Sequence, residues 1–146
     1  MTAAREQFDA WLDVMDASIA AFVRDLPPEV AARLDGSPES LEALEAWLLE
    51  RYPSPEAMRP EPERYDVDGA ARYFGEVLRR ELGGSWDLED GNDRALFAGV
   101  PVLRGVGVPG GPPVAPLYAV SAAADRRTGR FLSDMLGSLR AAGGTR

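Results

Sequence analysis

Polar and apolar positions over residues 66–82 follow the period of a helix, and the rest of the fold is predicted around this segment. Apolar side chains recur there every three or four residues, which predicts one buried stripe. Asp66 is predicted as the N-cap, because its carboxylate can accept free N–H groups of the first turn. Gly83-Gly84 is predicted to end the helix, since glycine adopts left-handed backbone readily. Gly75, at the edge of the stripe, indicates that another element packs closely there.

The same spacing predicts three further helical segments of different length. Residues 3–26 read as one long amphipathic helix that ends at Pro27-Pro28. Residues 37–52 read as a helix capped by Ser37, and residues 128–141 as a last helix before the C-terminus.

Strands are predicted after the central helix, where apolar and polar residues begin to alternate with a period of two. Residues 85–89 form the first, with Trp86 facing the helix. Residues 94–98, 100–104 and 114–121 are further candidates. We therefore expect an α+β fold in which three to four helices pack on a small antiparallel sheet of three or four strands, in the order α-α-α-β-β-β-(β)-α.

The chain is expected to form a single α+β domain over residues 1–146. A proline-rich connection at residues 53–64 is predicted to run over the surface, because its prolines prevent a regular helix or strand. It is not predicted to be a domain boundary, because the amphipathic helices on both sides each need a packing partner. A Gly/Pro-rich segment at residues 105–113 contains the pattern G-x-G-x-x-G, but its prolines remove the N–H groups and the helix that a phosphate site needs. It is predicted to be a mobile loop that could serve as a lid.

Composition excludes several chemistries. The chain has no cysteine and no histidine, and all sixteen of its basic residues are arginine. Thiol nucleophiles, imidazole bases, the usual zinc sites and Schiff-base lysines are thereby excluded. We expect no cofactor and no metal, and whether the chain is an enzyme stays open, with the balance against it. A net charge of −8 argues against nucleic-acid binding.

The favoured hypothesis is a non-enzymatic, acidic protein-binding module for a partner with a basic surface. An immunity-like or antitoxin-like protein or an accessory subunit would have this composition. The predicted contact residues lie on acidic helix faces: Asp9, Asp13, Asp16, Glu42 and Glu45. The wide apolar face of the first helix also makes a homodimer through that helix an alternative.

The other hypothesis is a small-molecule binding protein or a carboxylate-dependent enzyme. Its pocket would lie between the sheet and the 66–82 helix, beneath the Gly/Pro-rich loop. The candidate pocket residues are Arg72, Tyr73, Glu76, Glu81 and Trp86. Glu76 is expected to be a solvated partner of an arginine, and Glu81 to lie on the border of the apolar face.

Neither a signal peptide nor an apolar run of membrane-spanning length is visible, so we expect a cytoplasmic protein without a membrane segment. The abundance of Arg, Ala, Gly and Pro suggests a GC-rich genome.

Residues 68–77, followed by Gly83-Gly84-Ser85-Trp86 and preceded by residues 34–41, resemble a family of small actinobacterial proteins of unknown function. In that family a serine-capped helix precedes a Gly-Ala-x-Tyr-Phe-Gly-Glu type of helix and a tryptophan strand. The resemblance covers residues 34–103. It implies an α+β fold and no particular activity.

Overall fold

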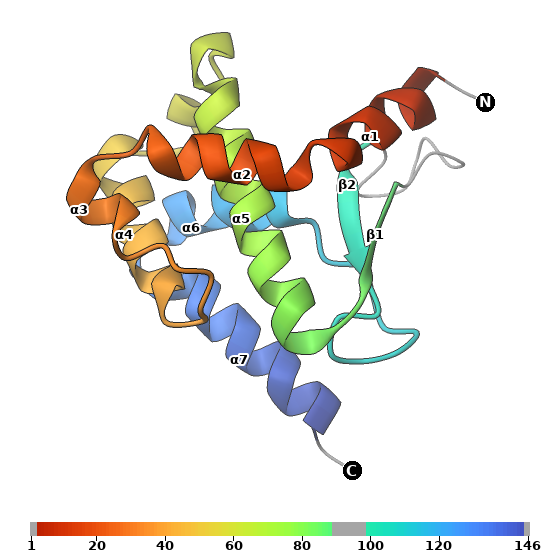
Figure 1. The fold of residues 1–146 in the computed structure, drawn as a ribbon. Helices are drawn as coiled ribbons and strands as arrows, with labels where there is room; N and C mark the ends of the chain where they lie inside the picture. Colours follow the sequence, from red (N-terminus) through yellow and green to blue (C-terminus); the bar gives the residue numbers. More distant parts are fainter. Residues whose placement is uncertain (1–2, 89–98, 145–146) are drawn as a thin grey trace.

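The central helix of the computed structural model is α5 (Arg64–Leu82), around which the other elements are arranged (Figure 1). The structure describes residues 3–88 and 99–144. The predicted apolar stripe of α5 is buried, and the helix ends as expected at Gly83, which has φ 80°. The predicted N-cap is wrong: α5 begins two residues earlier, and Asp66 lies in its first turn, where it pairs with Arg51 at 3.0 Å.

The predicted N-terminal helix is two helices, α1 (Ala3–Asp13) and α2 (Met15–Arg24). They are separated at Val14, whose φ of −107° and ψ of 20° leave the helical range. The break lets α2 cross α5, with Phe22 packed against Gly69, while α1 continues toward the sheet (Figure 1).

Short helices occupy the segment between α2 and α5. These are α3 (Pro28–Ala31), α4 (Ser40–Arg51) and the 3-10 helices η1 (Pro55–Met58) and η2 (Glu61–Glu63). The proline-rich connection is thus partly helical, because its prolines stand at the first positions of helical turns, where a missing N–H costs nothing.

The sheet is smaller than predicted. Within the described residues it has two strands, β1 (Ser85–Leu88) and β2 (Pro101–Arg104), which pair antiparallel with Trp86 opposite Leu103. Val114 adds only an isolated bridge to Leu103. The expectation of three or four strands is therefore wrong; the candidate strand at residues 94–98 lies outside the described residues.

The predicted strand at residues 114–121 is largely a helix, α6 (Pro116–Arg126). Pro116 occupies the first turn, and the alanines that follow have the highest helix propensity. The buried residues Ala119, Val120, Ala123 and Ala124 repeat at helical spacing. This period was hidden at the sequence level because an unbroken apolar run fits both element types.

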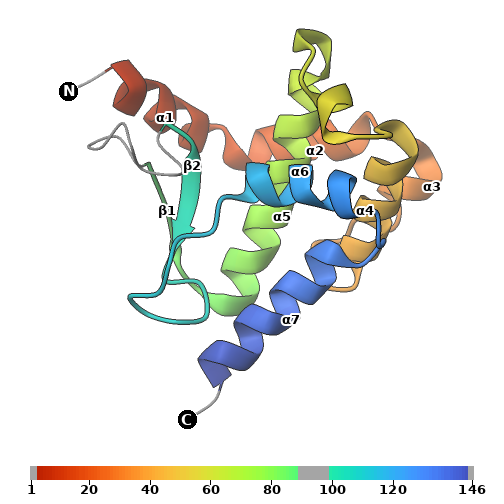
Figure 2. The same ribbon diagram turned by 180° about the vertical axis from the view of Figure 1, so that it is seen from behind.

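The last helix, α7 (Phe131–Gly144), packs with α6 on the side of α5 seen from behind (Figure 2). Its first N–H groups lie in the interior and need acceptors. Glu45 of α4 supplies them, since its carboxylate accepts the N–H of Phe131 at 3.1 Å and of Leu132 at 2.8 Å. Glu45 is fully buried, so its predicted place on the wet face of α4 is wrong.

The described residues thus form seven α-helices and a two-stranded sheet, so the expectation of three to four helices is also wrong, and the fold is α+β with helices dominant. The core lies where α2, α4, α6 and α7 meet α5. None of the helices in residues 3–88 and 99–144 combines the length and the hydropathy needed to cross a membrane.

Candidate small-molecule pocket

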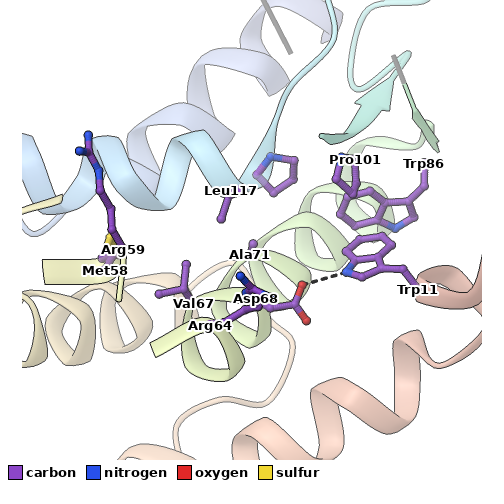
Figure 3. A pocket seen from close by; sticks show the side chains of 11 residues that line it. Trp11, Met58, Arg59, Arg64, Val67, Asp68, Ala71, Trp86, Pro101 and Leu117 are labelled. Atoms are coloured by element: carbon purple, nitrogen blue, oxygen red, sulfur yellow. Dashed lines mark hydrogen bonds between the residues drawn. The ribbon is translucent and has the colours of Figure 1, made fainter. Parts of the chain in front are cut away.

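A cavity of about 390 Å³ lies beside the N-terminal half of α5 (Figure 3). Val67 and Ala71 of α5 form its floor, and Leu117 at the start of α6 lies across from them. Trp11 and Trp86 close one end, whereas Met58 and Arg59 lie at the other. Elements that are distant in sequence therefore build one elongated and mainly apolar hollow.

The tryptophan end is a fixed wall made by two different elements. The indoles of Trp11 and Trp86 meet edge to face, with ring centroids 4.9 Å apart at 78°. Trp86 can lie directly on α5 because residue 75 is glycine: a Cβ there would stand 2.2 Å from the indole. The sequence-based expectation that something packs closely on Gly75 is confirmed, and that something is Trp86.

The indole of Trp11 is held by an ion pair on α5 between the buried Arg72 and the partly exposed Asp68. Its Nε1 donates to Oδ1 of Asp68 at 2.8 Å, and Nε of Arg72 donates to Oδ2 of the same carboxylate at 2.6 Å. The Arg72 guanidinium also lies 4.2 Å from the centre of the Trp11 ring and donates to the Trp11 carbonyl at 2.7 Å. Arg72 is only 4% exposed, so this network fixes α1 against α5.

The indole of Trp86 is held in the same way about two helical turns further along α5. Its Nε1 donates to Oε2 of Glu76 at 2.8 Å, and Arg79 donates to both oxygens of that carboxylate at 2.8 and 3.0 Å. Burial by itself would raise the pKa of Glu76, but the hydrogen bonds from Arg79 and Trp86 outweigh it and lower the pKa. Glu76 is therefore ionised at neutral pH and acts as an anchor.

Three of the five predicted pocket residues have other roles. Glu76 was expected to be a solvated partner of Arg72 or Arg80, but it is buried and pairs with Arg79. The hydroxyl of Tyr73 accepts the N–H of Gly36 and bonds to Ser40, which ties α5 to the start of α4.

Glu81 pairs with Arg140 of α7 at 2.8 Å near the surface. Arg72 lies behind the pocket wall as the partner of Asp68, and Trp86 lines the cavity itself.

The Gly/Pro-rich segment at residues 105–113 lies away from this cavity. It follows β2 and runs near the C-terminal end of α5, where the N–H of Gly107 donates to the carbonyl of Leu82 at 3.2 Å (Figure 1). A Cβ on Gly107 would also meet the backbone of Leu139 in α7. The segment is thus packed against helix ends and does not cover the pocket.

The acidic positions predicted for protein binding are mostly exposed. Asp9, Asp13 and Asp16 on α1 and α2, and Glu42 on α4, lie at the surface. In the described part of the chain none of the four forms a hydrogen bond or an ion pair. Glu45 is the exception, because it is buried and accepts the first backbone N–H groups of α7. Among the same residues no group of three or more acidic side chains is arranged to hold a metal ion.

Sequence reasoning missed Trp11, Met58, Arg59 and Arg64 as lining residues. Trp11 was assigned to a continuous apolar face, and the other three fall in or next to the proline-rich connection. No local pattern marks them, because the pocket exists only where α1, η1 and α5 come together.

Comparison with protein-family models, with curated proteins and with solved structures finds no match for this chain.

Proposed function

We propose that this protein binds an elongated, largely apolar small molecule in the cavity between α1, η1, α5, β1 and α6. The observation that carries the proposal is a partly open cavity of about 390 Å³ with a mainly apolar lining. Ligand pockets typically have volumes of about 300–1,000 Å³ and an apolar lining with few polar groups.

Binding is favoured over catalysis by the state of the acidic group in the wall. Both oxygens of Asp68 already accept hydrogen bonds, one from Trp11 and one from Arg72. The two hydrogen bonds hold the carboxylate in one orientation, and the ion pair with Arg72 compensates its charge. These contacts support a structural role for Asp68, in which it orients the indole toward the ligand.

The tryptophans provide a direct binding assay. Two of the three tryptophans in the chain line the cavity, whereas Trp47 contacts Phe22 and Tyr52 in the core. We expect decanol, as a neutral probe, to change the tryptophan emission saturably and to raise the unfolding temperature, since a ligand that binds only the folded state stabilises it.

A cavity-filling variant tests the location. Ala71→Leu adds side-chain atoms to the floor and should abolish decanol binding. Ala122→Leu is the matched control, because Ala122 lines a different hollow between α6 and α7. Leu117→Trp fills the same cavity from α6 if the first variant does not fold. Equal binding by folded Ala71→Leu, or no response of the wild type, would refute the proposal.

The protein-binding hypothesis and the cytoplasmic location stay predictions. What supports a basic partner is that Asp9, Asp13 and Asp16 are exposed, and that none of them forms a hydrogen bond or an ion pair within the described residues, although Asp16 interacts electrostatically with Arg79. The relation to small actinobacterial proteins likewise rests on the sequence motifs alone.

A further inference from the structure

Two arginines that line the pocket, Arg59 and Arg64, lack a side-chain partner within the described residues. In the described part of the chain, neither Arg59 nor Arg64 forms a hydrogen bond or an ion pair through its side chain. Most other described arginines near the core are engaged by carboxylates or carbonyls; examples are Arg51, Arg72, Arg79, Arg127 and Arg140. Other described arginines, Arg33 among them, also lack a side-chain partner; Arg59 and Arg64 differ from these in that both line the apolar cavity.

The carboxylates closest in sequence to these arginines are occupied elsewhere. Glu63 and Asp66 both pair with Arg51, at 2.8 and 3.0 Å. Glu61 lines an adjoining hollow together with Arg64, but it forms no ion pair within the described residues. Two of the nearby carboxylates are thus engaged by Arg51, and Glu61 lies near Arg64 without forming an ion pair within the described residues.

The pocket is consequently positive although the chain carries a net charge of −8. Asp68 is the acidic group among its described lining residues, and Arg72 neutralises it at 2.6 Å. That leaves the charges of Arg59 and Arg64 uncompensated beside a low-dielectric cavity. Such an arrangement attracts an anion, because apolar walls weaken the screening of charge.

The shape of the site assigns the two ends of a ligand. Figure 3 shows the indoles of Trp11 and Trp86 at one end, and Arg59 with Met58 at the other. Arg64, the first residue of α5, lines both this cavity and the adjoining hollow. An apolar chain would lie along Val67 toward the indoles with a charged head at the Arg59 end, and Arg64, which lies beside Asp68 in Figure 3, adds a second positive charge between the two ends.

We propose that the ligand is an amphipathic organic anion, whose carboxylate is attracted by the positive charges of Arg59 and Arg64 and whose apolar chain fills the cavity. This inference rests on the proposed small-molecule function. Arginine suits the role because its guanidinium can donate two parallel hydrogen bonds to a carboxylate.

A head-group series separates this inference from the proposed function. Decanoate, decanol and decylamine share one apolar chain and differ in charge, and their dissociation constants are measured by tryptophan emission at neutral pH. We expect decanoate to bind about tenfold more tightly than decanol, which corresponds to about 1.4 kcal/mol, and decylamine to bind most weakly. The advantage of decanoate should shrink as salt is added.

Variants locate the effect. In Arg59→Gln/Arg64→Gln the affinity for decanoate should fall to that for decanol, while decanol binding is unchanged. Arg33→Gln is the matched control, because Arg33 is another exposed arginine whose side chain is unpaired within the described residues and lies outside this pocket. Equal wild-type affinity for decanoate and decanol would overturn the anion inference and leave the pocket function standing. Failure of all three probes would overturn both.

Discussion

Replacing Gly75 by alanine tests whether the contact between α5 and Trp86 builds the pocket. The new Cβ would lie 2.2 Å from Cη2 and 2.5 Å from Cζ2 of Trp86, and 3.1 Å from Cγ of Pro116. Carbon atoms cannot approach so closely, so the indole must leave the helix surface. Its hydrogen bond to Glu76, now 2.8 Å, would then lengthen or break.

The expected loss of stability in Gly75→Ala is the balance of opposing effects on the free energy of unfolding. Alanine gains roughly 1 kcal/mol over glycine from helix propensity alone. Overpacking costs about 1–3 kcal/mol, and a lost hydrogen bond to a charged group costs about 1.5–3 kcal/mol. Because Arg79 still satisfies Glu76, the net expectation is a loss of about 2–4 kcal/mol.

The assay is urea unfolding followed by far-UV circular dichroism, with two glycine-to-alanine controls. Gly69→Ala places a Cβ 2.4 Å from Phe22 in the same helix, so it should destabilise α5 without displacing Trp86. Gly137→Ala in α7 meets nothing within 4 Å and should stabilise the fold by about 0.5–1 kcal/mol.

Ligand binding distinguishes the two crowded glycines. Gly75→Ala should lose decanol binding, because the indole moves, whereas folded Gly69→Ala should keep it. A Gly75→Ala protein that is as stable as wild type and binds decanol equally would show that Trp86 does not pack on α5 as described.

Three further outcomes are expected. Glu45→Ala leaves the first N–H groups of α7 without acceptors and should lower the free energy of unfolding by about 1–3 kcal/mol, measured by urea unfolding; an unchanged midpoint would contradict the buried contact. The pKa of Glu76 is lowered from its ordinary value of 4.5, so its stabilising contribution is complete above that value and is lost as the pH falls through the folded-state pKa. The stability difference between wild type and Glu76→Gln should therefore shrink on acidification, and a difference that is constant with pH would refute this. Asp9, Asp13 and Asp16 form the exposed acidic face, and reversing their charges should abolish the salt-sensitive capture of a protein partner from lysate. If the partner is still captured, this face is not the interface.

The sequence predicted those elements whose signal is local. The stripe of α5 and its stop at Gly83 depend on side-chain period and on the backbone freedom of one glycine, and both were predicted correctly. The strand that carries Trp86, the strand that begins at Pro101 and the C-terminal helix were also predicted close to their observed bounds. Each of these elements can be recognised from the residues within it, without knowledge of what packs against it.

Tertiary structure decided what local patterns leave open. The apolar segment that contains Val120 fits a strand or a helix, and packing on α5 makes it the helix α6. Glu45 and Glu76 have the spacing of solvated residues, yet both are buried because a helix start and an indole supply their hydrogen bonds. The pocket needs Trp11 and Trp86 side by side although they are distant in the chain. The spacing of apolar residues along the chain determines which residues form a helix or a strand. Only the packing of these elements determines which polar groups meet and where a cavity remains.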